Sequence, residues 1–268
     1  YNEYAERVKQ FEAKYGEDWE STMIEYSNDF VSLPKYIFVA GGKGDLRTVL
    51  QWLGKGNIKE RVNAKCEEAG GTSLLWIAAI NNRHNLMSYL LLNGADVNIV
   101  NSSGTSVLVT VGCESGNHLQ TARLLLCWGA ELFLAGKQVT KEEKLFLCNE
   151  SSKRGNAALS DLMSSELGGR RCEIVSAPST RSDLVGKTCV VDEYFKESDQ
   201  YKVKMEFTNE VLRVGVDNLK RRDRTPRDPG YYVECKNNRL IRRDFESNEE
   251  CQAFIASLRS DKDESVKV

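Results

Sequence analysis

Two short glycine-rich stretches have residue types that could hold phosphate. Val185-Gly186-Lys187-Thr188 matches the end of a phosphate-binding loop, in which backbone N–H groups and a lysine contact phosphate oxygens. Such a loop also needs a glycine five residues before Gly186, and Arg181 stands there. The second stretch, Gly41-Gly42-Lys43-Gly44, lies between two expected helices and does not follow a strand. Neither stretch therefore predicts a nucleotide-binding site.

The two histidines could in principle serve a catalytic site. Catalysis needs a nucleophile, a base and an orienting group within reach of one another. His84 and His118 both fall at the turn between two expected helices, at equivalent places in two similar segments. Equivalent turn positions favour a structural role. We therefore predict no catalytic residue, and we expect the protein not to be an enzyme.

The cysteines do not form a metal-binding pattern. No two of them are separated by two residues, so the paired spacing of a structural zinc site is missing. We predict no metal site and no cofactor. Scattered cysteines with apolar neighbours are typical of buried thiols in a reducing compartment, which indicates an intracellular protein of the cytoplasm or nucleus, with the plastid stroma as an alternative. The eight cysteines are Cys66, Cys113, Cys127, Cys148, Cys172, Cys189, Cys235 and Cys251.

Composition indicates a soluble globular protein of one large or two modest domains. The chain has 268 residues, of which 41% are hydrophobic and 28% charged, and its formal net charge is −2. No overall charge favours nucleic acid or membrane, so any such preference must come from a local surface. Apolar stretches such as Leu74–Ile80 fall far short of the roughly 20 residues that cross a bilayer. The charged start, Tyr1–Trp19, shows no secretory signal, although the first residue is not Met and a preceding segment stays possible.

The middle of the chain repeats itself. The ending Leu-Leu-x-x-Gly-Ala occurs twice, and its glycines, Gly94 and Gly129, are 35 residues apart. The triplet Gly-Thr-Ser also occurs twice, beginning at Gly71 and Gly104. Each unit carries one alanine-rich and one leucine-rich helical segment, and such a unit cannot bury its apolar face alone. We therefore predict a stack of helix pairs.

These residues resemble the ankyrin repeat, whose period is about 33 residues. Gly94-Ala95-Asp96-Val97-Asn98 matches the ending of that repeat without a gap. The opening at Ser73–Ala79 matches too, with Leu74 and Trp76 in place of the usual Pro and His. The resemblance covers about 100 residues. It implies a helical solenoid that binds a protein partner on its concave side, through loop tips and first helices.

The resemblance places four residues on the expected binding surface. Trp76, Ile80 and Val109 would be exposed on first helices, and Asn101 would lie at a loop tip. A large aromatic residue such as Trp76 is a candidate hot spot for binding. The alternative is that Trp76 packs inside the stack.

The composition changes at Leu184, where short segments with strand patterns begin. Tyr201–Phe207 alternates apolar and polar residues, which predicts a strand with one buried face. The succession through Leu219 resembles small SH3-like barrels over about 40 residues. Asn237-Asn238 predicts a two-residue hairpin turn, and Ser247-Asn248-Glu249-Glu250 predicts the start of a helix that runs to about Leu258. The whole chain is also similar to uncharacterised algal ankyrin proteins, some with a MYND zinc finger, which the missing cysteine pairs exclude here.

The predicted fold class is α+β and multidomain: an all-α ankyrin solenoid, then a small β-barrel and β-hairpin domain with a C-terminal helix. The expected parts are an N-terminal helical cap (1–33), about three ankyrin repeats (34–135), a degenerate helical capping unit (136–169), a linker (170–183), an SH3-like β-rich domain with hairpin and helix (184–258) and a tail (259–268).

A local basic surface is expected in the β-rich part. Residues 184–245 contain 14 Lys and Arg against 11 Asp and Glu, a net charge of +3. Such a surface could contact RNA or an acidic partner, although a run of charges is more often a solvated face. The residues of the predicted patch are Lys220, Arg221, Arg222, Arg224, Arg242 and Arg243.

The sequence thus favours an adaptor or scaffold that holds an unidentified protein on the ankyrin surface, with the β-rich domain as a second contact. Two alternatives stay open. One is a nucleic-acid-binding protein that uses the basic surface, and the other is a structural subunit of a stable complex.

Overall fold

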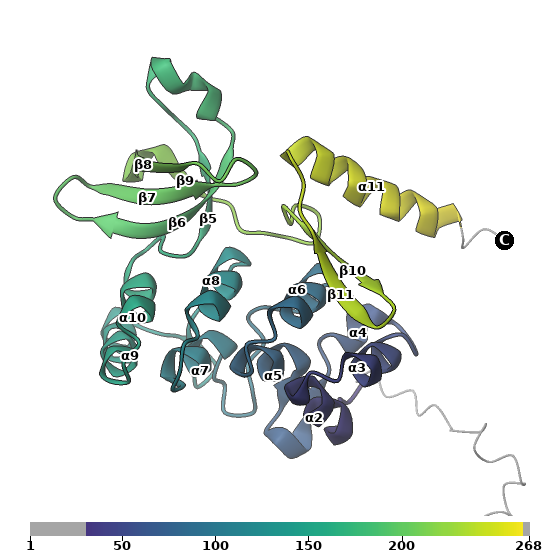
Figure 1. Cartoon of the computed structure of the whole chain (residues 1–268). Helices are drawn as coiled ribbons and strands as arrows, with labels where there is room; N and C mark the ends of the chain where they lie inside the picture. The colour runs from purple at the N-terminus through teal and green to yellow at the C-terminus, as the bar shows by residue number, and fades with distance from the viewer. Residues whose placement is uncertain (1–30, 265–268) are drawn as a thin grey trace, which may run out of the picture. The chain divides into compact units, whose positions relative to one another are not determined.

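The computed structural model describes residues 31–264, and side chains through residue 258. Figure 1 shows helix pairs in its lower half and strands above them. Most of the predicted N-terminal helical cap, 1–33, lies outside the described residues.

Four helix pairs follow one another along the chain. Their first helices form a row in which each contacts the next, and we call it the first-helix row: α2 (Lys35–Lys43), α5 (Leu74–Ile80), α7 (Val107–Cys113) and α9 (Lys141–Lys153). Their second helices are α3 (Leu46–Leu53), α6 (His84–Leu92), α8 (Leu119–Cys127) and α10 (Ala157–Ser164), and we call them the second-helix row. Within it α8 contacts both α6 and α10 (Figure 1).

Local sequence explains where these helices begin and end. The Ser73 hydroxyl accepts the backbone N–H of Trp76 at 3.3 Å, which caps the start of α5. Gly94 and Gly129 follow α6 and α8 with φ of 92° and 87°, a left-handed backbone that favours glycine. Repeated Leu-x-x-Gly-Ala endings therefore terminate helices at equivalent places.

Small residues let the first helices approach closely. A Cβ atom added to Gly41 in α2 would lie 3.1 Å from Leu74 and 3.2 Å from Ile77 in α5. The glycine-rich stretch 41–44 therefore serves helix packing, and residues 31–40, the described part before it, contain no strand.

Short turns project between the helix pairs. The first contains α4 (Ile58–Arg61), β1 (Lys65–Cys66), η1 (Glu67–Ala69) and β2 (Thr72–Ser73), and the last pairs β3 (Phe133–Leu134) with β4 (Lys137–Gln138).

Asparagines at equivalent positions join one unit to the next. The side-chain oxygen of Asn63 accepts the backbone N–H of Asp96 at 2.7 Å. The side-chain oxygen of Asn98 accepts the backbone N–H of Glu131 at 2.8 Å.

Five strands form an antiparallel sheet in the order β8-β7-β6-β5-β9. Each pairs with its neighbours only, so β8 and β9 are the edges and the described strands form no closed barrel. The predicted barrel is thus seen only as a sheet. Its elements are β5 (Arg171–Ile174), η2 (Ser179–Leu184), β6 (Thr188–Phe195), β7 (Gln200–Met205), β8 (Val211–Gly215), η3 (Val216–Asn218) and β9 (Leu219–Arg221).

The predicted linker, 170–183, contains a central strand instead. Strand β5 pairs with both β6 and β9, and its Cys172 and Ile174 belong to the buried core of the sheet. Arg171 obscured this strand in the sequence, because a fully buried arginine is rare and needs partners that only the folded chain supplies. The sheet therefore begins before the predicted boundary at residue 184.

The end of the chain forms a hairpin and a helix. Strands β10 (Tyr232–Lys236) and β11 (Arg239–Arg243) are joined by Asn237 and Asn238, which have φ of 52° and 57° as the predicted turn requires. Helix α11 covers Asn248–Glu264, so it continues beyond the predicted end at Leu258 and into the predicted tail, 259–268. The last residues of that tail, 265–268, lie outside the described residues.

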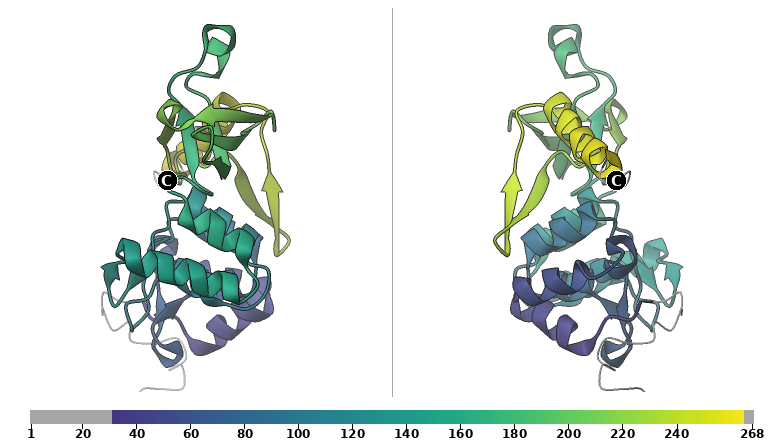
Figure 2. Two further views of the ribbon diagram at one scale, coloured as in Figure 1. Left: turned by 90° about the vertical axis from the view of Figure 1, so that its left-hand side faces the viewer. Right: turned by 90° about the vertical axis from the view of Figure 1, so that its right-hand side faces the viewer.

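The C-terminal part of the chain packs against the second-helix row. Both strands of the hairpin contact α6, and the views in Figure 2 agree that the hairpin runs alongside the helices. The Trp128 indole, just after α8, donates to the hydroxyl of Tyr231 at 3.0 Å, and that hydroxyl donates to Ser88 in α6 at 3.3 Å. Tyr231 is 1% exposed, so its ring is part of the packing between the two regions.

Candidate partner-binding sites

Two of the four residues expected on the ankyrin surface are buried. Trp76 and Val109 are each 5% exposed, so neither can be reached by a partner in this conformation. Both side chains fill space within the stack, because the short helices α5 and α7 contact neighbouring helices over most of their circumference. The expectation that Trp76 and Val109 are exposed is wrong.

The other two are partly exposed but differ in their contacts. Ile80 lies half-buried at the end of α5. The side-chain oxygen of Asn101 accepts the N–H groups of Ser103 and Thr105 at 3.1 and 2.9 Å, and the Ser103 hydroxyl at 2.8 Å. Asn101 therefore shapes its own turn, and Ile80 is the one apolar residue of the four with accessible surface.

Large apolar side chains are exposed elsewhere on the first-helix row. Leu145 and Phe146 on α9 are 61% and 62% exposed, and Tyr36 and Val39 on α2 are 62% and 43% exposed. They lie on the two helices that end the row. The sequence held a signal for α9, because the four apolar residues 145–148 cannot all face inward on one helix.

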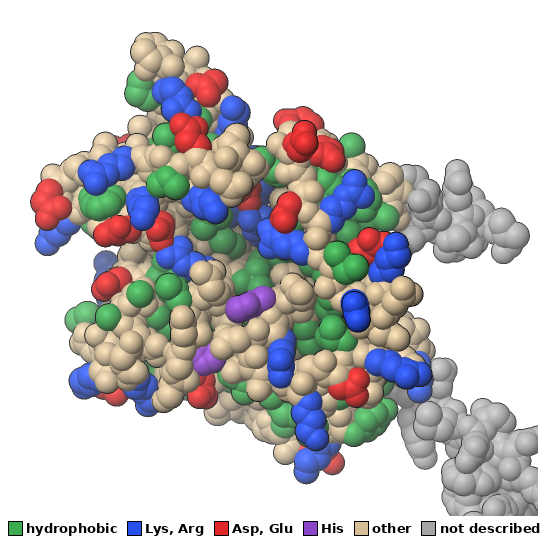
Figure 3. All heavy atoms as spheres, viewed as in Figure 1, with side chains coloured by type: hydrophobic (Ala, Val, Ile, Leu, Met, Phe, Trp, Pro, Cys, Tyr) green, Lys and Arg blue, Asp and Glu red, His purple; other side chains and the backbone are tan. Residues whose placement is uncertain are grey.

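The predicted basic patch is neutralised by acidic residues from distant parts of the chain. Arg221 forms an ion pair with Glu131 at 2.6 Å, and Arg222 forms one with Glu173 at 2.8 Å. Arg224 is half-buried and pairs with Glu206. Figure 3 shows acidic and basic side chains interspersed on this face. Three of the six residues expected in the basic patch are therefore paired with carboxylates that lie far from them in the sequence or across the sheet.

The remaining patch residues differ in their surroundings. Arg242 forms an ion pair with Asp244 at 2.8 Å, and its guanidinium lies 4.1 Å from the centre of the Tyr231 ring. Arg243 lies 4.3 Å from the centre of the Phe254 ring. Within the described part of the chain, Lys220 is the patch member with neither an ion pair nor an aromatic contact.

A buried ionic cluster connects the sheet to the segment before the hairpin. Arg171 is fully buried and pairs with Glu206 at 2.7 Å and with Asp228 at 2.9 Å. Burial raises the pKa of Glu206, but the nearby charges of Arg224 and Arg171 outweigh it, so the pKa lies below its ordinary value. Burial also raises the pKa of Asp228, but the hydrogen bonds and the charge of Arg171 outweigh it, so this pKa too lies below its ordinary value. Through these ion pairs Arg171 joins strand β5 to Glu206, after β7, and to Asp228, before the hairpin.

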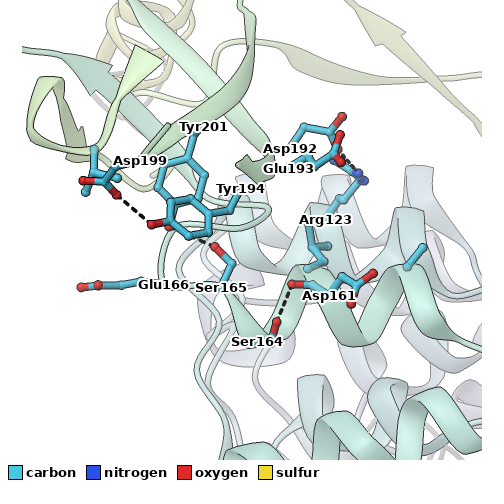
Figure 4. Close-up of a pocket in the computed structure, with 13 residues that line it drawn as sticks. Arg123, Asp161, Ser164, Ser165, Glu166, Asp192, Glu193, Tyr194, Asp199 and Tyr201 are labelled. Carbon is cyan, nitrogen blue, oxygen red and sulfur yellow. Dashed lines mark hydrogen bonds and ion pairs between the residues drawn. The ribbon is translucent and has the colours of Figure 1, made fainter. Parts of the chain in front are cut away.

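A cleft of about 800 Å³ lies where the second-helix row meets the sheet (Figure 4). One wall is α10 with residues 165 and 166, and the other is formed by β6, β7 and η3. The rings of Tyr194 and Tyr201 lie 4.9 Å apart between these walls. Its remaining lining residues are Arg123, Ala158, Asp161, Leu162, Ser164, Ser165, Glu166, Asp192, Glu193, Asp199 and Val216.

Hydrogen bonds hold both tyrosines of the cleft. Tyr194 donates to Asp199 at 2.7 Å, and this acceptor, followed by burial, raises the pKa of the phenol. The hydroxyl of Tyr201 accepts from the hydroxyl of Ser165 at 3.0 Å and from the backbone N–H of Leu167 at 3.4 Å. The two phenols are therefore held by different parts of the chain. Ser165 lies just after α10, and Asp199 lies just before β7.

The cleft carries more carboxylates than cations. Arg123 is the single basic residue of its lining, and it pairs with Asp192, which also contacts Lys202 at 3.4 Å. Burial raises the pKa of Asp192, but the hydrogen bond and charge of Arg123 outweigh this and lower it. The sequence analysis did not predict this site. Its one signal was the adjacent pair Asp192 and Glu193 within an expected strand, where acidic residues are uncommon.

His84 and Thr188, two of the groups considered for chemistry in the sequence, have structural partners. His84 hydrogen-bonds Thr121 of the next unit at 2.9 Å, and Thr121 donates to Asn82 at 2.6 Å. Thr188, at the end of the phosphate-loop match, donates to Glu206 at 2.6 Å. Within residues 31–264 no three His, Cys, Asp or Glu side chains are grouped to hold a metal ion.

Residues 37–134 match the family model of ankyrin repeats, with three copies. This match covers the first three helix pairs and confirms the prediction of about three repeats. Residues 37–134 therefore carry ankyrin repeats, and such repeats generally mediate contacts between proteins. A comparison with curated proteins found none that matches the chain. No helix in the described part of the chain is long and apolar enough to cross a membrane.

Proposed function

We propose that this protein is a non-enzymatic adaptor that binds a protein partner through the first-helix row of its ankyrin stack. One observation carries the proposal: Tyr231 and the hairpin pack on α6 and on Trp128 in the second-helix row, whereas apolar side chains stay exposed on first helices. In this arrangement the C-terminal region supports the stack from one side, and the partner approaches from the other.

The exposed pair on α9 supports an apolar contact. Leu145 and Phe146 are adjacent, large and each more than 60% exposed. Neighbouring apolar side chains that stay in water often mark a surface for protein binding. Aromatic residues are also frequent at the energetic centre of such interfaces. Phe146 takes the role that the sequence had assigned to Trp76.

The arrangement of the β-rich region supports a second contact. Strand β5 lies between β6 and β9, and the 3₁₀ turn η3 precedes β9 at the edge of the sheet. We propose that this region presents an additional contact to the assembly. We also propose a compartment that keeps thiols reduced, as expected from the scattered cysteines of the sequence.

The proposal is tested by partner capture with matched surface variants. The test variant combines Leu145→Ser and Phe146→Ser, and the control combines Val211→Ser and Ile241→Ser, which are exposed apolar residues outside the first-helix row. Proteins captured by the wild-type chain should be retained by the control and lost from the test variant, with unchanged circular dichroism in both. Equal loss from both variants, or from neither, contradicts the proposal.

The same experiment separates an adaptor from a structural subunit. A subunit of a stable complex co-purifies with fixed partners in equal amounts, whereas an adaptor exchanges its partner within the duration of a wash. Adding an excess of unlabelled chain to the captured complex measures that exchange. We expect release of the bound partner, and a partner that stays bound indicates the structural subunit.

A further inference from the structure

We infer that the cleft between α10 and the sheet binds an arginine- or lysine-rich segment of a partner protein. The inference rests on the proposed function, because it names the chemistry of the second contact. It also uses a different surface from the apolar pair on α9, so each can be tested alone.

The shape of the cleft suits side chains from an extended segment. It has a volume of about 800 Å³ and is open to solvent, so an extended chain could lie in it. Its walls come from two regions of the fold, which contact each other through α10 and β6. Figure 4 shows the Tyr194 and Tyr201 rings between these walls, with acidic side chains on both sides.

The exposed ring of Tyr194 provides an attractive surface for a cation. Tyr194 is 40% exposed and packs on the buried ring of Tyr201, which is 4% exposed and tilted by 44° to it. A guanidinium or ammonium group near the face of a tyrosine is attracted by the negative charge density of the ring. Because hydrogen bonds to Asp199 and Ser165 already fix the two phenols, little side-chain freedom is lost on binding.

The carboxylates determine the charge of the occupant. Five of them line the cleft against one guanidinium, that of Arg123, which is already paired. Within the described part of the chain, no cation pairs with Asp161, Glu166 or Glu193. An acidic or phosphorylated segment would therefore be repelled, and a basic segment would find charge complementarity.

The spacing of these carboxylates argues against a metal ion. Nowhere in residues 31–264 do three acidic, histidine or cysteine side chains converge on one point. Separated carboxylates with aromatic rings between them instead match several cationic side chains presented along an extended chain. Surface ion pairs each contribute little, so affinity must come from several such contacts together.

The test uses fluorescence anisotropy with the full chain and a short labelled peptide of alternating Arg and Ser. The control peptide has Glu in place of Arg. In the protein, Asp161→Asn with Glu193→Gln removes two cleft charges, and Glu67→Gln with Glu68→Gln removes two exposed charges from the ankyrin turn. A third variant, Tyr194→Leu, removes the exposed ring and keeps every charge.

The wild-type chain should bind the Arg peptide and not the Glu peptide. The cleft double variant should bind about tenfold more weakly, Tyr194→Leu should also bind more weakly, and the Glu67 and Glu68 variant should bind as the wild type does. No binding of the Arg peptide, or equal weakening by both charge-removing variants, overturns the inference. Either result leaves the capture experiment on Leu145 and Phe146 unaffected, so failure of the cleft is distinguishable from failure of the adaptor proposal.

Discussion

The indole nitrogen of Trp128 donates a 3.0 Å hydrogen bond to the hydroxyl of Tyr231, 103 residues further along the chain. Trp128 follows the last helix of the third ankyrin repeat, and Tyr231 precedes the C-terminal hairpin. Because both side chains are buried, this bond lies inside the contact between the stack and the C-terminal region. The two regions are therefore expected to unfold together.

Removing the Tyr231 hydroxyl tests that coupling. Tyr231→Phe keeps the ring but leaves the Trp128 N–H and the Ser88 hydroxyl without their buried partner, which costs about 1–3 kcal/mol. We expect one cooperative transition at a lower Tm, measured by scanning calorimetry. Tyr232→Phe, on the adjacent half-buried residue, serves as the control and should change Tm less. Two separate transitions in the wild-type chain would contradict the coupling.

Acid should destabilise the fold through the buried ionic cluster. The pKa values of Glu206 and Asp228 are lower in the folded chain than their ordinary values of 4.5 and 3.8. Their contribution is therefore complete above those ordinary values and is lost as the pH falls through the lowered folded values. Urea unfolding at a series of pH values should show stability declining below about pH 4.5.

Glu206→Gln provides the matched variant for the acid experiment. The variant should be less stable than wild type near pH 7, because Arg171 and Arg224 lose a charged partner. Its stability should also depend less steeply on pH in the acid range. The exposed control Glu249→Gln should follow the wild-type curve. A Glu206→Gln curve parallel to that of the wild type would show that the cluster does not carry the acid response.

We expect the buried Trp76 side chain to stabilise the fold and not to bind a partner directly. Trp76→Ala empties a buried site in the second repeat and should cost roughly 3–5 kcal/mol, whereas Ile80→Ala, on a half-buried residue of the same helix, should cost less. Urea unfolding of the two variants measures the difference. A folded Trp76→Ala chain with unchanged stability but weaker partner capture would restore the hot-spot interpretation.

Because the arginines of the predicted basic patch are paired, we expect the protein not to bind nucleic acid. Because Arg221, Arg222 and Arg224 already have acidic partners, few charges remain to displace counterions from a phosphate backbone. A generic labelled oligonucleotide should not bind at low salt. Salt-sensitive binding that is lost when Arg221 and Arg222 are changed to Glu would favour the nucleic-acid alternative.

Features set by neighbouring residues were predictable from the sequence. The Gly94-Ala95-Asp96 ending identified the repeat, because a left-handed glycine after a helix is a local requirement. The Asn237-Asn238 turn likewise needs two positive φ angles that asparagine tolerates. The start of α11 at Asn248 followed from Ser247, whose hydroxyl accepts the N–H of Glu250 at 3.1 Å.

Features set by distant residues were not predictable. Strand β5 contains Arg171, which looks like a surface residue until Glu206 and Asp228 are brought beside it. Likewise, Glu131 neutralises Arg221 from 90 residues away, which no local charge count can show. The cleft has the same origin, because its walls come from α10 and β6 and meet only in the folded chain.

Site-specific photo-crosslinking tests the central claim, that the partner binds the first-helix row, most directly. A photoreactive amino acid replaces Phe146 on α9 in one chain and Ile241 on β11 in another, since both positions are exposed. Irradiation of the captured complex should crosslink the partner from position 146 and not from position 241. Crosslinking from position 241 alone, or equally from both, would contradict the claim.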